Sequence, residues 1–262
     1  MKQEKENLIN EDDYVNMYKC GNYKEIVCCR QDTNINITRL SKNQYIDNST
    51  GEIKDYHYSE YKTLDSIKRQ FKNIPRFIKG YFDCDNTERF ITLTYSYIMN
   101  KPSNLSYDFK KFIKKIIRRY GKCRYIYIKE PNGKGSWHIH SLIKRLDGKP
   151  FNITDEALRK LWGNGYAVSN EIPYNLYTLP QYFDVTRYDD KKSRLVYYPP
   201  YLNIYGCSED MKIEKINGLY KDLKPSEMPK IYDSENHYIF ADKDDGEIKG
   251  NWKTVYEQYK TV

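Results

Sequence analysis

The sequence predicts an α+β fold: an antiparallel sheet of the ferredoxin or RRM type with packed helices and with additions at both ends. Two observations carry this prediction: short runs with β-type composition, and two amphipathic segments with helical spacing. They follow one another as strand, helix, strand, strand, helix, strand, an order typical of a ferredoxin-like sandwich. The six segments are residues 90–95, 105–120, 124–130, 137–144, 153–162 and 166–170.

The segments before residue 90 are shorter and less regular. Residues 23–58 contain several β-type runs, and Asn48-Ser49-Thr50-Gly51 predicts the turn of a hairpin. Residues 59–80 show helical spacing at Leu64, Ile67 and Phe71, and we expect this helix to end near Pro75.

The pattern becomes clearer from residue 90 onward. FITLTY (90–95) is typical of a buried strand, and a break at residues 101–104 precedes the helix over 105–120. The apolar residues of this helix lie on one predicted stripe: Leu105, Phe109, Phe112, Ile113, Ile116, Ile117 and Tyr120. Lysine and arginine fill most of the remaining positions.

Two strands, residues 124–130 and 137–144, flank the sequence PNGKGS, whose glycines favour a hairpin loop. In the second amphipathic helix, Thr154 is the expected N-cap and Gly163 the expected end. A strand at 166–170, a tyrosine-rich stretch and a strand at 194–198 follow.

The chain contains no repeat and no Gly/Ser-rich linker, so composition marks no clean domain boundary. We expect an N-terminal extension over residues 1–85, the main domain over 86–205 and a C-terminal extension over 206–262. No apolar run approaches the roughly 20 residues of a membrane helix, and the first residues lack a signal-peptide core. A cytoplasmic protein without a membrane partner is therefore predicted.

The charge distribution favours a polyanionic partner. The whole chain has a net charge of +8, but both ends are acidic, and residues 14–240 hold 38 basic and 26 acidic side chains. Lysine and arginine placed on phosphates release condensed counterions, so this balance favours nucleic acid, although a solvated lysine-rich surface has the same composition. The six cysteines form no CxxC pair and are interpreted as reduced thiols, with Cys28 and Cys29 buried in a strand.

His138 and His140 form the sharpest local feature. Residues two apart in a strand point to the same face, so both imidazoles project together and could hold a divalent metal. The hairpin brings Glu130 alongside them, which predicts a Glu-His-His site suited to Mg²⁺ or Mn²⁺. Two alternatives stay open: half-exposed histidines without a ligand, and a zinc hydrolase, which would need a third histidine or cysteine nearby.

Four ordered segments of the chain resemble the HUH endonucleases, and more narrowly the rolling-circle replication initiators (Rep proteins) of Gram-positive plasmids and phages. They are FITLTY (90–95), FKKFIKKIIRRY (109–120), RYIYIKEPNGKGSWHIHSLI (124–143) and LWGNGY (161–166). RLVYYPPYLNIYGCS (194–208) and TVYEQY (254–259) are also similar to segments of such proteins. The resemblance covers about residues 20–262 and is strongest over 88–205.

The resemblance implies the HUH endonuclease fold and metal-dependent nicking of single-stranded DNA at a replication origin. It implies that His138, His140 and Glu130 bind the metal, and that a tyrosine after the WGxG segment attacks the DNA and becomes joined to its 5′ phosphate. Tyr182 matches this position best and Tyr177 is second, with Tyr174 and Tyr188 as further alternatives. The stretch departs from the family pattern, because Pro180 interrupts it and no lysine follows within one turn.

Three cations of the basic helix, Lys114, Arg118 and Arg119, are predicted to contact DNA phosphates, unless they form only a solvated helix face. Trp137 and Tyr125 could stack on bases or pack in the core. The expected partners are single-stranded or hairpin DNA at the origin and the host helicase and polymerase. Two other functions stay open: a non-catalytic RRM-like binder of single-stranded nucleic acid, and an HUH transposase or relaxase.

Overall fold

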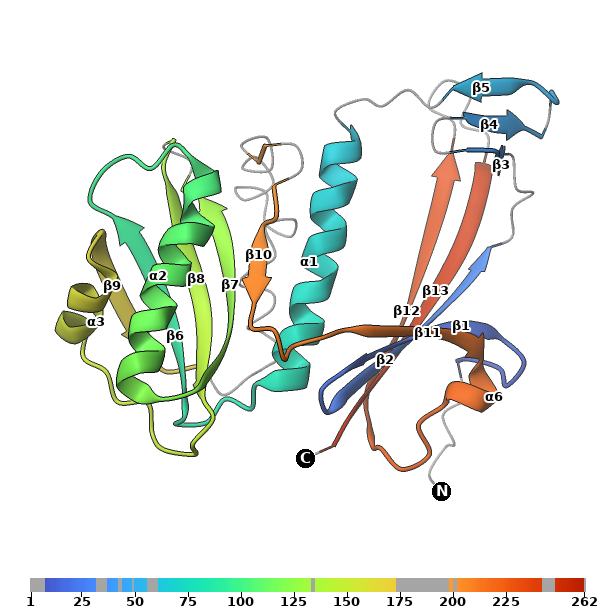
Figure 1. Ribbon diagram of the computed structural model, residues 1–262. Helices are drawn as coiled ribbons and strands as arrows, with labels where there is room; N and C mark the ends of the chain where they lie inside the picture. The colour runs from blue at the N-terminus through green and yellow to red at the C-terminus, as the bar shows by residue number, and fades with distance from the viewer. Residues whose placement is uncertain are drawn as a thin grey trace. The chain divides into compact units, whose positions relative to one another are not determined.

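The computed structural model describes residues 8–31, 37–41, 44–48, 50–55, 61–132, 135–172, 198–199, 202–241 and 248–261. The chain divides into two compact units (Figure 1): Met1–Ser59 with Glu214–Val262, and Glu60–Ile213. The domain boundaries after residues 85 and 205 stay a prediction. Within the described ranges, no helix is long and apolar enough to cross a membrane.

The sheet of the first unit combines strands from both ends of the chain. Its order is β11-β1-β2-β13-β12, so the early strands β1 and β2 lie between late strands (Figure 1). All its strand pairs are antiparallel, and Cys28 of β2 lies opposite Val255 of β13. The strands are β1 (Tyr14–Cys20), β2 (Tyr23–Gln31), β11 (Glu214–Leu219), β12 (Lys230–Ala241) and β13 (Ile248–Lys260).

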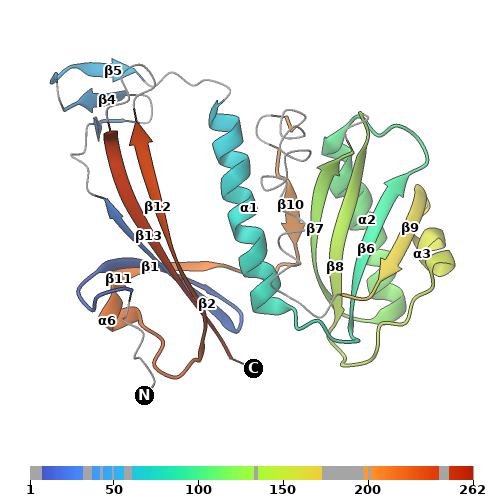
Figure 2. The ribbon, with the colours of Figure 1, turned by 180° about the vertical axis from the view of Figure 1, so that it is seen from behind.

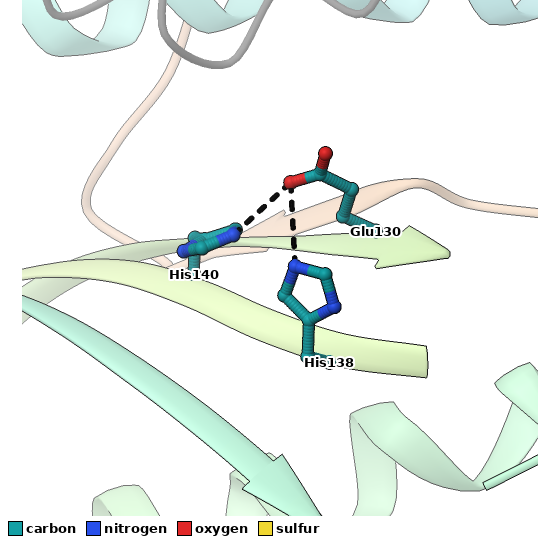
Figure 3. Close-up of side chains that lie close together, drawn as sticks. All are labelled: Glu130, His138 and His140. Atoms are coloured by element: carbon teal, nitrogen blue, oxygen red, sulfur yellow. Dashed lines mark ion pairs between the residues drawn. The ribbon is translucent and has the colours of Figure 1, made fainter. Parts of the chain in front are cut away.

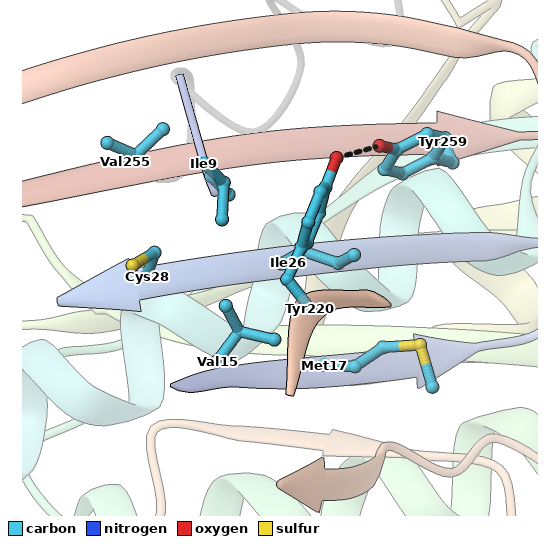
Figure 4. Packing of buried hydrophobic residues seen from close by; sticks show 8 residues of the cluster. All are labelled: Ile9, Val15, Met17, Ile26, Cys28, Tyr220, Val255 and Tyr259. Atoms are coloured by element: carbon cyan, nitrogen blue, oxygen red, sulfur yellow. Dashed lines mark hydrogen bonds between the residues drawn. The ribbon is translucent and has the colours of Figure 1, made fainter. Parts of the chain in front are cut away.

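The core of this unit lies on one face of the sheet, where alternate residues of the strands meet the short helix α6 (Tyr220–Leu223). The cluster in Figure 4 contains Ile9, Val15, Met17, Ile26, Cys28, Tyr220, Val255 and Tyr259. Cys29, in contrast, is exposed, so the prediction that both neighbouring cysteines are buried is wrong for Cys29. The cause is the alternation of side chains along a strand.

The unit also buries a carboxylate completely. Glu257 is 0% exposed, and its Oε2 accepts hydrogen bonds of 2.7 Å from the hydroxyls of both Tyr220 and Tyr259. Its Oε1 accepts a hydrogen bond of 2.9 Å from the Lys230 ammonium. These three donors compensate the carboxylate for its lost hydration.

A separate three-stranded sheet is formed by β3 (Ile37–Arg39), β4 (Gln44–Asp47) and β5 (Ile53–Asp55). Strands β4 and β5 pair antiparallel, which confirms the predicted hairpin. Gly51 closes its turn with a φ of +72°, and its N–H donates to the Asp47 carbonyl at 2.7 Å.

Helix α1 (Tyr61–Tyr81) opens the second unit and contains Pro75, so the prediction that it ends near Pro75 is wrong. A proline inside a helix removes one hydrogen bond and crowds the preceding turn, at a cost of about 3 kcal/mol. The apolar stripe continues beyond it, however, to the buried Phe77 and Ile78. Burying such side chains contributes about 1.5–3 kcal/mol each, which offsets the cost of the proline.

The second unit contains a five-stranded antiparallel sheet in the order β10-β7-β8-β6-β9. Its strands are β6 (Glu88–Tyr95), β7 (Cys123–Pro131), β8 (Trp137–Arg145), β9 (Gly165–Asn170) and β10 (Tyr205–Cys207). Helix α2 (Pro102–Tyr120) joins β6 to β7, and α3 (Asp155–Trp162) joins β8 to β9. The predicted α+β class and the predicted order of these six elements are confirmed.

Helix α2 covers one face of this sheet, as the opposite views of Figures 1 and 2 show. Its buried side chains are Leu105, Phe109, Phe112, Ile113 and Ile116, and Phe109 stacks on Tyr127 of β7 with ring centroids 4.1 Å apart. Ile117 is 37% exposed, so its predicted place on the buried stripe is wrong, because it lies to one side of that stripe. The helix begins earlier than predicted, with Pro102 in its first turn, where a missing N–H costs nothing.

The ends of α3 match the prediction. The Thr154 hydroxyl accepts a hydrogen bond of 3.3 Å from the Ala157 N–H, and Gly163 adopts the left-handed conformation with a φ of 74°. Strand β9 then starts at Gly165, where a Cβ atom would lie 2.4 Å from the backbone nitrogen of Ser96. Only glycine allows this close approach, which fixes the position of β9 against β6.

Candidate metal centre

The register of β6, β7 and β8 brings the three predicted ligands together. Glu130 pairs directly with His138, and His140 lies two residues further along the same strand. Side chains alternate between the faces of a strand, so all three point away from the face that carries Tyr127 and helix α2. The candidate site therefore lies on the sheet face that α2 does not cover.

The ligand atoms converge on one point, as Figure 3 shows. Glu130 Oε2 lies 3.0 Å from His140 Nε2 and 3.5 Å from His138 Nε2. Ligand atoms about 3 Å apart are what a single ion with bonds of about 2.0–2.2 Å requires. One carboxylate and two imidazoles could hold Mn²⁺, Mg²⁺ or Zn²⁺ and would leave coordination positions open for a phosphate oxygen.

The site is largely buried and polar. Burial by itself raises the pKa of Glu130, but hydrogen bonds and charge from His138 and His140 outweigh it, so the pKa lies below its ordinary value. The side chains of Glu130 and His140 are each 7% exposed, whereas that of His138 is 16% exposed. His138 is thus the ligand most open to an approaching substrate.

A hydroxyl orients one of the imidazoles. Thr92 Oγ1 lies 3.1 Å from His140 Nδ1, which leaves Nε2 directed toward Glu130. Phe90 stacks on the same imidazole, with ring centroids 5.5 Å apart and planes 15° apart. Partners of this kind fix the orientation of a ligand and raise its basicity. Sequence analysis missed Thr92; its place two residues from Phe90 on the same strand face is the signal that points to it.

The site face continues onto the edge strand β9. Thr94 of β6 pairs with His138 on one side and with Tyr166 on the other, so these three residues form a row across the sheet. Tyr166 is 66% exposed, and Val168, two residues along, is 41% exposed. Strands lie about 4.8 Å apart, which places the Tyr166 backbone about 10 Å from that of His138. Sequence analysis did not select either residue.

A second acidic cluster lies on the same face at the opposite end of β6. It consists of Asp83, Asp85 and Glu88, and the structure places a lysine ammonium within it. Lys144 Nζ lies 2.5 Å from Asp83 Oδ2 and 2.9 Å from Glu88 Oε1. The Glu88 carboxylate also accepts the N–H groups of Asp83 and Cys84, each at 2.9 Å. The ammonium already neutralises this cluster.

The structure separates the other predicted site residues from the Glu-His-His cluster. Lys114, Arg118 and Arg119 are exposed on α2, which covers the opposite sheet face. Trp137 is 5% exposed and packs edge-on against Tyr198 with ring centroids 5.2 Å apart, so it lies in the core.

Tyr125 is half-buried and packs against Phe109 of α2, on the face away from the site. The predicted nucleophile Tyr182 and the alternatives Tyr177, Tyr174 and Tyr188 lie outside the described residues. So does the predicted strand at 194–198, except for its last residue.

Residues 88–192 match a protein family described as replication-associated protein of the ORF2 type. The matched region runs from β6 through β9 and contains Glu130, His138 and His140. No significant match is found among curated proteins or among solved structures. Over this region the chain is similar to replication-associated proteins, a similarity that supports a role in the initiation of DNA replication.

Proposed function

We propose that the protein is a rolling-circle replication initiator of the HUH endonuclease class, which nicks single-stranded DNA and transfers the cut strand. The observation that carries this proposal is the convergence of Glu130, His138 and His140 on an uncovered sheet face. These residues lie within the region that is similar to replication-associated proteins. The strand order β9-β6-β8-β7, with all neighbours antiparallel, further supports a ferredoxin-like arrangement.

In this proposal Glu130 Oε2 and the Nε2 atoms of His138 and His140 hold Mg²⁺ or Mn²⁺. A divalent ion bound there would polarise the scissile phosphate and neutralise charge that develops on it. Thr92 keeps the His140 ring in its binding orientation, and the partial exposure of His138 leaves the phosphate a direction of approach. Burial of Glu130 and His140 strengthens their electrostatic interaction with a cation.

The proposed nucleophile is Tyr182, with Tyr177 second and Tyr174 and Tyr188 as further alternatives. Its phenolic oxygen forms a bond to phosphorus, and the bond between phosphorus and the 3′ oxygen breaks. The protein is then joined to the 5′ phosphate, and the released 3′ oxygen takes up a proton. Because the phosphodiester energy is kept in the new bond, the reverse attack by a 3′ hydroxyl rejoins a strand without ATP.

The exposed side chains of β9 are the proposed contacts for the strand beside the scissile phosphate. Tyr166 lies in the row of His138 and Thr94, at a backbone distance of about 10 Å from His138. An exposed aromatic ring at this distance suits stacking on a base one or two nucleotides from the metal centre. Stacking of this kind contributes about 1–3 kcal/mol per base.

The experiment that tests this function incubates the protein and labelled single-stranded origin hairpins with Mn²⁺ and resolves the products on denaturing gels. We expect a protein–DNA adduct that is lost in His138→Ala and in Tyr182→Phe and kept in the matched control Tyr97→Phe, which alters an exposed tyrosine away from the cluster. Loss in Tyr177→Phe with retention in Tyr182→Phe would assign the nucleophile to Tyr177. An adduct that needs neither metal nor any tyrosine would overturn the proposal.

A second candidate function is a non-catalytic binder of single-stranded nucleic acid. The exposed Tyr166 and Val168 favour it, because RRM-like sheets present stacking residues on an open face. Such a protein would bind the strand equally well with EDTA and would form no adduct. The proposed replication role adds the host helicase and polymerase as partners, on a plasmid, phage or integrated element.

A further inference from the structure

We propose that the outer face of helix α2 is a second DNA-binding surface, which holds the backbone of duplex DNA rather than the strand that is cut. The inference rests on the proposed function, since a replication origin supplies a duplex next to the exposed strand. It names a separate surface, on the other side of the sheet from the metal centre.

The cations of α2 form a regular stripe. Tyr107, Lys111, Lys114 and Arg118 are spaced by four, three and four residues, so they lie on one line of the helix surface. This line is opposite the buried stripe that contains Leu105, Phe109 and Ile116, and all four of its side chains are exposed. Lys110 and Arg119 flank the line and are also exposed.

The length of the stripe suits a DNA groove. A helix rises 1.5 Å per residue, so about 10 Å separate Lys111 from Arg118. The major groove of B-DNA is about 12 Å wide and admits an α-helix. The cations at the two ends of the stripe could therefore contact phosphates on opposite sides of one groove.

The charge of the stripe is not neutralised within the part of the chain that the structure describes. There, no carboxylate lies within 4.0 Å of Lys110, Lys111, Lys114, Arg118 or Arg119, whereas Lys54, Lys160 and Lys221 each form an ion pair. Asp108 is the only acidic residue of α2, and its Oδ2 accepts a hydrogen bond of 2.9 Å from the Tyr95 hydroxyl. A row of cations without carboxylate partners is what a phosphate backbone recognises.

One lysine of the same helix has a structural partner, which separates it from the others. Lys115 Nζ donates a hydrogen bond of 2.8 Å to the Leu161 carbonyl at the end of α3. Lysines at such positions compensate the partial negative charge of a helix C-terminus. Lys115 is therefore assigned to the packing of α2 and α3 and is left out of the proposed surface.

The position of α2 determines which DNA it can hold. The helix covers the face that carries Tyr127, and the Glu-His-His cluster lies on the opposite face. The nucleotides at the metal centre therefore cannot lie on the stripe at the same time. Contacts to phosphates alone carry no sequence information, so this surface would position a duplex and leave origin recognition to other residues.

The test compares the triple variant Lys110→Gln, Lys114→Gln, Arg118→Gln with a matched control, Lys19→Gln, Lys149→Gln, Lys212→Gln. Each variant removes three exposed positive charges, but the control residues lie away from α2. Fluorescence anisotropy with a blunt duplex of about 20 base pairs, in EDTA and over about 50–200 mM KCl, measures affinity and its salt dependence.

We expect the slope of log K against log[KCl] to fall by about 2–3 in the α2 variant, because each phosphate contact contributes about 0.9. We also expect a loss of duplex affinity of roughly 10- to 100-fold at about 100 mM KCl, with the control unchanged. Equal losses in both variants, or no loss in the α2 variant, would overturn the inference, as would a wild-type protein that does not bind the duplex.

A second measurement separates this inference from the proposed function. A short single-stranded oligonucleotide that contains the nick site but forms no duplex is cleaved with Mn²⁺, and the α2 variant should cleave it at the wild-type rate. His140→Ala should lose this cleavage and keep duplex binding. If no variant cleaves but the duplex result is as expected, the proposed function fails and the second surface stands.

Discussion

The same face of the sheet in the second unit carries a buried glutamate at each end, and the two have different neighbours. Glu130 faces two imidazoles, whereas Glu88 faces the Lys144 ammonium and two backbone N–H groups. Hydrogen bonds from the imidazoles lower the pKa of Glu130 despite burial, while burial outweighs the partners of Glu88 and raises its pKa. An imidazole that loses its proton becomes a metal ligand, but an ammonium fills the place of a cation. The comparison therefore assigns metal binding to the first cluster and stability to the second.

The largest effect is expected from His140→Ala, which removes one of three ligands. Loss of a residue that only supports a ligand costs roughly 10- to 100-fold in metal affinity, so loss of the ligand itself should cost more than about 100-fold. Isothermal titration calorimetry with Mn²⁺ measures the affinity. Glu88→Gln is the control, and a comparable loss there would contradict the distinction between the clusters.

The next effect concerns Thr92→Val, which keeps the side-chain shape but removes the hydroxyl beside His140 Nδ1. We expect an Mn²⁺ affinity lower by roughly 10- to 100-fold, because the imidazole loses the partner that orients it. The matched control is Thr94→Val on the same strand face, since the Thr94 side chain makes no hydrogen bond to the described residues. Equal affinities of the two variants would show that Thr92 does not support the site.

Glu88→Gln should act on stability instead. The amide that replaces one carboxylate oxygen cannot accept both backbone hydrogen bonds and weakens the pairing with Lys144. A buried group left without a partner costs about 1–3 kcal/mol, which we expect as a lower free energy of unfolding in urea titrations. Unchanged stability together with weaker Mn²⁺ binding would reverse the roles of the clusters.

The smallest effect is expected from Lys144→Gln. Without the ammonium, Asp83 and Glu88 lose the cation that neutralises them. A weak new Mn²⁺ site should appear, with a Kd on the order of 1 mM, typical of weak carboxylate sites. Paramagnetic broadening of the amide signals around residues 83–88 would detect it, and unbroadened signals at about 5 mM Mn²⁺ would mean that the carboxylates alone do not bind.

Local patterns were sufficient to predict much of the second unit. Alternating residues predicted β6, β7 and β8, and the two-residue spacing of His138 and His140 predicted their shared face. The end of α1 was mispredicted, because local rules weigh Pro75 but not the later burial of Phe77 and Ile78. Propensity is a weak prior that tertiary packing overrides.

Other features depend on pairings between distant segments, which one sequence does not reveal. The contact of Thr92 with His140 requires the register of β6 on β8, two strands separated by a helix and a further strand. The same limit applies to the first unit, where β2 pairs with β13. The candidate ligands were therefore predictable as a set, but the residues that support them were not.

The two-ended sheet of the first unit has a consequence for protein synthesis. Strands β1 and β2 leave the ribosome first, but β11, β12 and β13, which complete their sheet, are translated last. From the end of β2 to the end of β13 the ribosome adds 229 residues, which takes about 10–45 s at typical bacterial and eukaryotic rates. During this delay the second unit can fold, while β1 and β2 remain an unpaired hairpin with open edges. Nascent chains stalled before residue 214 should therefore bind chaperones through their N-terminal hairpin.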